Sequence, residues 1–267
     1  MHPGSGPSDR HNDVLFPPIR EHLLEAGIVV CSFDKRGVGG SGGSWLDAGI
    51  TEQADDLLAG LAAFESESAR GLRIGLFGHS QGGWVVIEAA GRGVPVAFVI
   101  TNSGPGVSPA RQERYSLANK LAESRRGEML ATYDAVVDVM RNCPTLAEGL
   151  EQLEAAHVPY RELPGLDFMF ENEALWRLSA EIFGYDPAPA LSRITAPVIA
   201  LFGAADEVTP PEESVEAFRA TVRPELLQIE VFPEGDHRLH HGEPPRFVDG
   251  YLDRIASFVT SCGRSPE

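Results

Sequence analysis

Ser80 has the surroundings of a reactive nucleophile. It lies at the centre of residues 78–82 (Gly-His-Ser-Gln-Gly), between an apolar run of strand length at 73–77 and a helical pattern at 82–90. A strand that turns sharply into a helix strains the backbone at the corner, and the flanking glycines leave room for a turn that exposes the serine. The pattern predicts a serine that attacks a carbonyl carbon. The alternative interpretation is a glycine-rich turn with an incidental serine.

A serine hydroxyl becomes a good nucleophile only when a base takes its proton and a third group orients that base. His237 follows an apolar run at 226–232, and Asp206 follows another at 197–202. In the chain order serine, acid, histidine, we expect Asp206 to orient His237 and His237 to activate Ser80. Asp206 as a simple turn or N-cap residue is the alternative. Neighbouring residues offer competing assignments: His240 or His241 as the base, and Glu207 or Asp236 as the acid.

Short apolar runs alternate with helical patterns along most of the chain. The runs are near-continuous, as expected for strands that are buried on both faces of a parallel sheet. Strands are predicted at 27–33, 73–77, 94–100, 197–202 and 226–232. Helices are predicted at 16–26, 50–66, 82–90, 211–222 and 246–261. Repetition of strand, helix and strand predicts an α/β fold with a mostly parallel sheet flanked by helices.

Residues 107–187 interrupt this alternation, because they show helical patterns separated by prolines and no convincing strand. The helices predicted here span 108–123, 128–141, 145–157 and 171–183. We therefore expect a core formed by 1–106 and 188–267, with 107–187 inserted as a helical cap. Such a cap would lie over the carboxyl ends of the strands, where open α/β sheets bind ligands.

Aromatic residues could line a substrate pocket beneath that cap. Phe168, Phe170 and Trp176 form an apolar cluster within the insertion, and Trp45 lies in a loop of the core. Because pockets and small cores have the same apolar lining, two interpretations stand. These side chains form the wall of an acyl pocket, or they only pack.

Several motifs together resemble the α/β-hydrolase superfamily, with the nearest likeness to bacterial esterases of the serine aminopeptidase (S33) and dienelactone-hydrolase-like group. They are Gly-His-Ser-Gln-Gly-Gly at 78–83, Gly-Ser-Gly-Pro-Ser-Asp-Arg at 4–10, Asp-Lys-Arg-Gly-Val-Gly at 34–39, Tyr-Asp-Pro at 185–187 and Ala-Pro-Val at 196–198. The resemblance spans nearly the whole chain. It implies an α/β-hydrolase fold and a Ser80, Asp206 and His237 triad.

The resemblance also implies an oxyanion hole made by two backbone N–H groups. One belongs to Gln81, the residue after the nucleophile, and the other to Ser5 in a loop that aligns with the His-Gly motif of the family. Pro3 occupies the position of the usual histidine, and His2 lies one residue earlier. In the family a strand precedes this loop, so we expect that the N-terminal strands are missing and that the native chain extends upstream of Met1.

Composition narrows the classes of partner. The formal charge is −17, and only two of the 22 basic residues are lysines. This surface disfavours binding to nucleic acid or to anionic membranes.

Three widely spaced cysteines argue against disulfides and a zinc site, and no signal peptide or membrane span is evident. A cytoplasmic location is expected, with no metal or cofactor. The charged residues Asp34 and Arg36 are expected to pair with neighbouring loops.

The sequence thus predicts a serine hydrolase that cleaves a carboxylic ester or a related small acyl compound through an acyl-enzyme. A peptidase or amidase with the same triad is one alternative. A non-catalytic protein that binds a small molecule on the same fold is another. The sequence does not indicate an oligomeric state.

Overall fold

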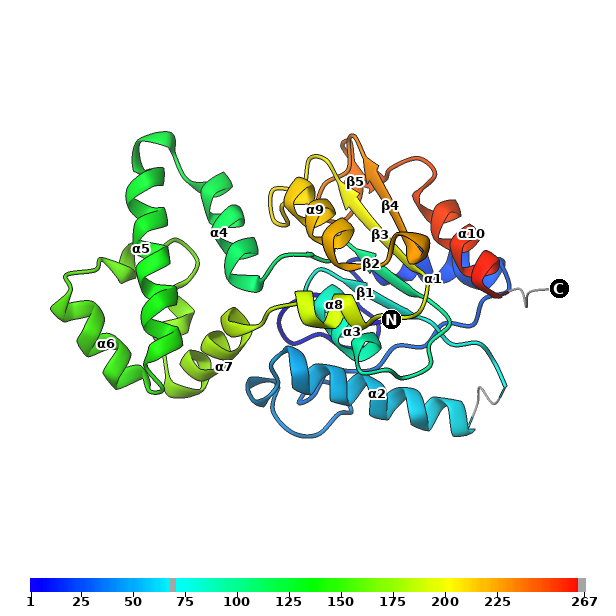
Figure 1. Cartoon of the computed structure of the whole chain (residues 1–267), viewed down its shortest axis with the longest axis horizontal. Coiled ribbons are helices and arrows are strands. Elements are labelled where there is room, and N and C mark those ends of the chain that lie inside the picture. The colour runs from blue at the N-terminus through cyan, green and yellow to red at the C-terminus, as the bar shows by residue number, and fades with distance from the viewer. Residues whose placement is uncertain (68–70, 264–267) are drawn as a thin grey trace.

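A parallel sheet lies between layers of helices in one half of the molecule (Figure 1). The computed structural model describes residues 1–67 and 71–263. Four strands, β1 (Leu76–His79), β2 (Val99–Asn102), β3 (Val198–Gly203) and β4 (Leu227–Phe232), lie side by side in chain order. All three neighbouring pairs are parallel. The predicted α/β fold is confirmed, and the carboxyl ends of these strands meet at one edge of the sheet.

Helices cover both faces of the sheet because side chains alternate along each strand. Val198, Ala200 and Phe202 pack on one face, while Ile199 and Leu201 pack on the other. The first face carries α2 (Ile50–Glu67), α3 (Gln81–Gly91), α8 (Ala188–Arg193) and α9 (Pro211–Thr221). The second face carries α1 (Phe16–Glu25) and α10 (Tyr251–Gly263). The two layers hold the strand ends rigid, which a precise site requires.

The prediction of a strand at 27–33 is wrong, because within the described part of the chain this segment has no regular secondary structure and pairs with no strand. An apolar cavity of about 510 Å³ separates it from β1. A strand needs a neighbour at about 4.8 Å for its hydrogen bonds, and across the cavity the two segments are too far apart for this pairing. At one end of the cavity the gap is bridged: the Met1 ammonium donates to Cys31 O at 2.6 Å, and His2 N–H donates to Phe77 O at 2.8 Å.

The last helix begins later than predicted. Residues 246–250 were expected in it, but α10 begins at Tyr251. Instead, β6 (Arg246–Phe247) pairs antiparallel with β5 (His240–His241), so this part of the chain forms a small hairpin. The hairpin follows His237 directly and closes the loop that carries this histidine.

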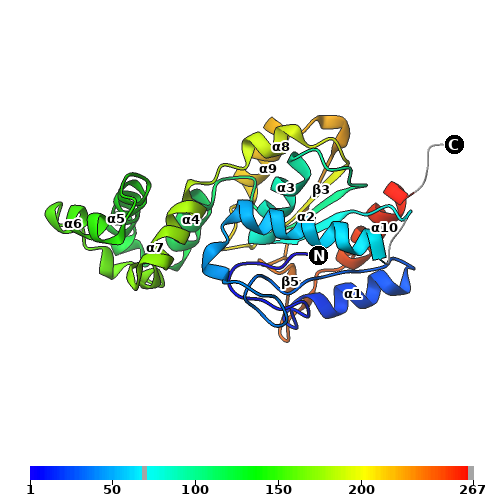
Figure 2. The ribbon, with the colours of Figure 1, turned by 90° about the horizontal axis from the view of Figure 1, so that it is seen from below.

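The remaining helices lie to one side of the sheet (Figures 1 and 2). They are α4 (Pro109–Lys120), α5 (Glu123–Asn142), α6 (Leu146–Ala155) and α7 (Glu173–Gly184), with short 3-10 turns at Tyr160–Glu162 and Asp167–Phe170. We call residues 107–187 the helical segment. It has an apolar core of its own around Tyr133, Leu153 and Trp176. Its role as a separate cap stays a prediction. No helix in the described part of the chain has the length and apolarity that a membrane span needs.

One contact between the helical segment and the core should depend on pH. Burial raises the pKa of Glu181 on α7 to about 7, with further contributions from the hydrogen bond and the charge of Glu52 on α2. The folded state therefore binds this proton more tightly than the unfolded state. Its stability should fall as the pH rises from the unfolded pKa near 4.5 to about 7 and then level off.

We expect Glu181→Gln to remove this loss of stability at high pH, because glutamine carries no charge at any pH. The melting temperature of the variant should exceed that of the wild type by about 1–3 °C at pH 8, and the two should agree at pH 5. Thermal unfolding followed by fluorescence at both pH values measures this difference. Glu151→Gln on the exposed surface of α6 is the matched control. An equal gain for Glu181→Gln at both pH values would contradict the explanation.

Candidate active site

Ser80 occupies the sharp turn between β1 and α3. Its backbone has φ 53° and ψ −122°, a left-handed conformation that a residue other than glycine rarely adopts. Such strain costs about 1–3 kcal/mol and is tolerated where the surroundings fix it. Gly78 is required here, because a Cβ at this position would collide with the backbone of Gly82. The turn leaves Ser80 partly exposed at the edge of the sheet.

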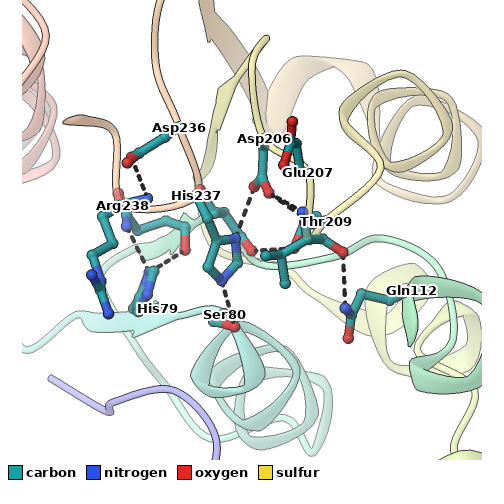
Figure 3. Close-up of polar contacts among 12 residues, drawn as sticks. His79, Ser80, Gln112, Asp206, Glu207, Thr209, Asp236, His237 and Arg238 are labelled. Atoms are coloured by element: carbon teal, nitrogen blue, oxygen red, sulfur yellow. Dashed lines mark hydrogen bonds and ion pairs between the residues drawn. The ribbon is translucent and has the colours of Figure 1, made fainter. Parts of the chain in front are cut away.

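His237 and Asp206 lie in line with Ser80 (Figure 3). His237 Nε2 is 2.9 Å from Ser80 Oγ, and His237 Nδ1 is 2.9 Å from Asp206 Oδ2. The three residues come from the loops after β4, β3 and β1, so the parallel sheet itself brings them together. In this geometry the imidazole can accept the serine proton on Nε2 while Nδ1–H donates to the carboxylate.

Asp206 is fixed by the turn that follows β3. Its side chain is only 1% exposed, and Oδ1 accepts hydrogen bonds from the N–H groups of Val208 at 2.7 Å and Thr209 at 2.8 Å. Oδ2 is left to face His237. The Tyr115 hydroxyl on α4 donates to Asp206 O at 2.9 Å, which ties the helical segment to this turn. One carboxylate oxygen therefore binds the backbone of the turn, and the other contacts His237.

The competing residues lie elsewhere. Asp236 Oδ1 accepts from Arg238 N–H and His240 N–H, each at 2.8 Å, and closes its own turn. Glu207 is exposed. The ring of His240 packs edge to face against Phe247, and His241 pairs with Glu234. Of the acids and histidines considered from the sequence, the structure brings only Asp206 and His237 to Ser80.

His79 is a neighbour that the sequence reasoning did not single out, although it lies within the serine motif. Its ring centroid is 5.1 Å from that of His237. Burial, with a smaller contribution from the charge of His237, lowers the pKa of His79 to about 3, so this ring is neutral. Its Nδ1 is held by Asn102, whose side-chain oxygen accepts a hydrogen bond from the Tyr251 hydroxyl at 2.7 Å. His79 thus gives His237 an uncharged, rigid support.

The loop that carries Ser5 lies directly beside Ser80. A Cβ built on Gly4 would be 3.3 Å from Ser80 Cβ. Within the described residues, the N–H groups of Ser5 and Gln81 donate to no acceptor. Two such N–H groups are what an oxyanion hole would need, if both point to the carbonyl oxygen of a substrate bound at Ser80.

Asp34 holds this loop in place, as a structural role predicts. Arg10 Nε and Nη2 bind its two carboxylate oxygens at 3.0 and 2.6 Å, and Gly40 N–H adds a bond at 2.9 Å. These hydrogen bonds, first among them that of Arg10, keep the pKa of Asp34 far below its ordinary value. Arg36 likewise binds Asp56 through two hydrogen bonds of 2.9 and 2.7 Å.

A cavity of about 430 Å³ adjoins Ser5 and Gln81. It lies between the core and the helical segment, and its wall includes Trp45, Phe168 and Glu113. Phe170 and Trp176 do not line it. Trp176 is fully buried in the core of the helical segment, where its indole N–H donates to Cys143 O, and Phe170 packs against its ring. For these two residues, the alternative interpretation of simple packing is the correct one.

Comparison with known proteins places this site in a family. The model of the family described as serine aminopeptidase, S33, matches residues 14–245, which include Ser80, Asp206 and His237. The chain belongs to this family. It is therefore a hydrolase of the α/β-hydrolase superfamily, as the resemblance implied.

A curated relative of this chain is similar to it at low sequence identity. A relative from Escherichia coli, an uncharacterised 31.7 kDa protein encoded in the traX-finO intergenic region, is 24% identical over 219 residues, which cover 78% of this chain and 73% of the relative.

Solved structures share the fold at low sequence identity. An esterase of Pyrococcus furiosus has a TM-score of 0.62 and 19% identity, covering 98% of this chain and 81% of its own. A monoacylglycerol lipase of Paleococcus ferrophilus has a TM-score of 0.60 and 20% identity, covering 97% and 93%. An esterase of Thermogutta terrifontis has a TM-score of 0.59 and 23% identity, covering 99% and 91%. These likenesses establish the fold of this S33 family member.

Proposed function

We propose that this hydrolase cleaves carboxylic esters of small molecules, with Ser80, His237 and Asp206 as its catalytic triad. The observation that carries the proposal is the unbroken hydrogen-bonded line from Ser80 Oγ through the imidazole to Asp206 Oδ2, at 2.9 Å for each step. The strained backbone of Ser80 supports it, because strain of this kind persists where function requires an exposed side chain.

In the proposed mechanism His237 Nε2 takes the proton of Ser80 as the hydroxyl oxygen attacks the ester carbonyl. Asp206 stabilises the imidazolium that forms and keeps Nδ1 as the protonated nitrogen. The imidazolium then gives its proton to the departing alkoxide, which leaves an acyl group on Ser80. Water, deprotonated by the same imidazole, attacks the acyl-enzyme and releases the acid.

The Ser5 and Gln81 N–H groups are proposed to hold the carbonyl oxygen while it carries negative charge. Each such donor is worth about 10²- to 10³-fold in kcat in serine hydrolases. The cavity of about 430 Å³ beside them would hold the substrate, since pockets of about 300–1,000 Å³ suit small molecules. Trp45 and Phe168 give it the apolar wall that an acyl or aryl group prefers.

A peptidase acting at a free amino terminus is the second candidate, and Glu113 is the observation that favours it. This glutamate lines the same cavity, and it makes no hydrogen bond or ion pair within the described residues. Burial raises the pKa of its carboxyl group, so a substrate amine that paired with it would relieve that cost.

A comparison of two substrates separates the candidates. An esterase should hydrolyse p-nitrophenyl acetate with a kcat/KM at least about 100-fold above that for aminoacyl p-nitroanilides. Glu113→Gln should leave ester hydrolysis within about threefold of the wild type. Preference for the nitroanilides, lost in Glu113→Gln, would instead establish the peptidase. A protein without hydrolysis of either substrate and without fluorophosphonate labelling would be a binding protein.

A further inference from the structure

Lys35 is buried beneath the loop that carries Ser5. Its exposed fraction is 8%, whereas Lys120, the other lysine of the chain, is exposed at the end of α4. Lysine is rarely buried to this degree without partners. Its ammonium has two: Nζ donates to Gly4 O at 2.5 Å and to Gln81 Oε1 at 3.2 Å.

The first of these bonds acts on the peptide group that ends in Ser5 N–H. A trans peptide is planar, and its C=O and N–H point in opposite directions. An ammonium that fixes Gly4 O on one side of the plane therefore fixes Ser5 N–H on the other. A hydrogen bond to the carbonyl also polarises the amide, which makes its N–H a stronger donor.

The second bond reaches the other proposed donor. Gln81 begins α3, and its side-chain oxygen also accepts a hydrogen bond from Gln53 Nε2 at 3.4 Å. Lys35 and Gln53 thus both bind the side chain of Gln81, whose N–H is the other proposed donor. Through Gly4 and Gln81, one ammonium joins the N-terminal loop and the first residue of α3, which carry the two proposed donors.

The electrostatic surroundings agree with a local role for this ammonium. Burial lowers the pKa of Lys35 to about 7. Burial and then the charge of Lys35 lower the pKa of His2, so this neighbouring ring stays neutral. Asp34, the residue before Lys35, is engaged by Arg10. Glu113 lines the same cavity as Lys35 and makes no ion pair within the described residues.

We propose that Lys35 is a positioning residue that holds the Ser5 and Gln81 N–H groups at the spacing needed for the oxyanion. The inference rests on the proposed function, since it assigns a role within the same site. Lys35 does not touch the reacting atoms in this role; it acts through two peptide groups. Its loss should therefore weaken binding of the transition state more than binding of the substrate.

Lys35→Met tests this role, because methionine keeps most of the chain length and removes the ammonium. We expect kcat for p-nitrophenyl acetate to fall about 10- to 100-fold, while KM changes less than about threefold. The inhibition constant of a trifluoromethyl ketone, which forms an anionic adduct with an active-site serine, should rise by the same factor as kcat falls. Lys120→Met makes the same substitution at an exposed site, and both of its constants should match the wild type.

The possible results distinguish this proposal from the proposed function. Active wild-type protein with an unchanged Lys35→Met variant would overturn the positioning role and leave the esterase standing. Inactive wild-type protein that binds no trifluoromethyl ketone would overturn both. If Lys35→Met does not fold, a crystal structure of the wild-type protein with the trifluoromethyl ketone bound to Ser80 tests the positioning role instead. The proposal requires Ser5 N–H and Gln81 N–H on the oxyanion, with Lys35 Nζ on Gly4 O. An Ser5 N–H turned away from the oxyanion would overturn it.

Discussion

Replacement of Ser80 by alanine is expected to lower kcat for ester hydrolysis by about 10⁴- to 10⁶-fold. The hydroxyl oxygen is the atom that becomes acylated in the proposed mechanism, and no other hydroxyl lies within hydrogen-bond distance of His237 among the described residues. Alanine has the same left-handed strain as serine at φ 53°, so the melting temperature should change by less than about 2 °C. Residual activity should come from the N–H donors and substrate binding alone.

Ser103→Ala is the matched control for Ser80→Ala. Ser103 follows the adjacent strand β2, is fully buried and also has a positive φ, at 48°. Its hydroxyl has no hydrogen-bond partner within the described residues. Steady-state hydrolysis of p-nitrophenyl acetate should therefore stay within about threefold of the wild type for Ser103→Ala. Comparable losses in both variants would mean that the loss in Ser80→Ala reflects damage to the sheet edge and not a missing nucleophile.

Asp206→Asn is expected to lower kcat by about 10⁴-fold while the protein stays folded. Asn can keep its oxygen on the N–H groups of Val208 and Thr209, which hold Oδ1 in the wild type. Its amide nitrogen then faces His237 Nδ1 as a donor. The imidazole must accept there, so its proton moves to Nε2, and the nitrogen beside Ser80 can no longer act as a base.

Asp236→Asn provides the comparison, because Asp236 is adjacent to His237 in sequence but faces away from its ring nitrogens. We expect its kcat to stay within about tenfold of the wild type. The measurement is the rate of ester hydrolysis of both variants, normalised to the fraction of folded protein. An Asp206→Asn variant as active as Asp236→Asn would exclude Asp206 as the residue that orients the base.

Much of the fold could be predicted because the apolar pattern reports burial. The runs that became β1, β2 and β3 are buried along their whole length, whereas β4 at the edge of the sheet is partly exposed. Buried apolar runs that alternate with amphipathic helices are typical of a parallel sheet. The run at 27–33 has the same composition, yet it forms no strand. Pairing depends on whether a neighbouring strand lies close enough, and the composition of the run itself does not predict this.

The arrangement at Ser80 could be predicted for a different reason. Loops at the carboxyl ends of parallel strands converge, so the residues that follow β1, β3 and β4 had to lie near one another. Phe170 and Trp176 could not be separated from Phe168 in this way, because one turn of backbone decides which aromatic ring faces the cavity. The burial of Lys35 could not be predicted from the sequence either, since a lysine after an apolar run is usually solvated. Its burial depends on contacts with segments distant in sequence, the loop at Gly4 and the start of α3 at Gln81.

Fluorophosphonate labelling followed by mass spectrometry tests the identity of the nucleophile most directly. The reagent phosphonylates a serine only where a base activates it. We predict one phosphonyl group per wild-type chain, located on the peptide that contains Ser80, present in Ser103→Ala and absent in Ser80→Ala. Wild-type protein that takes up no label, or label that persists in Ser80→Ala, would contradict the assignment of Ser80.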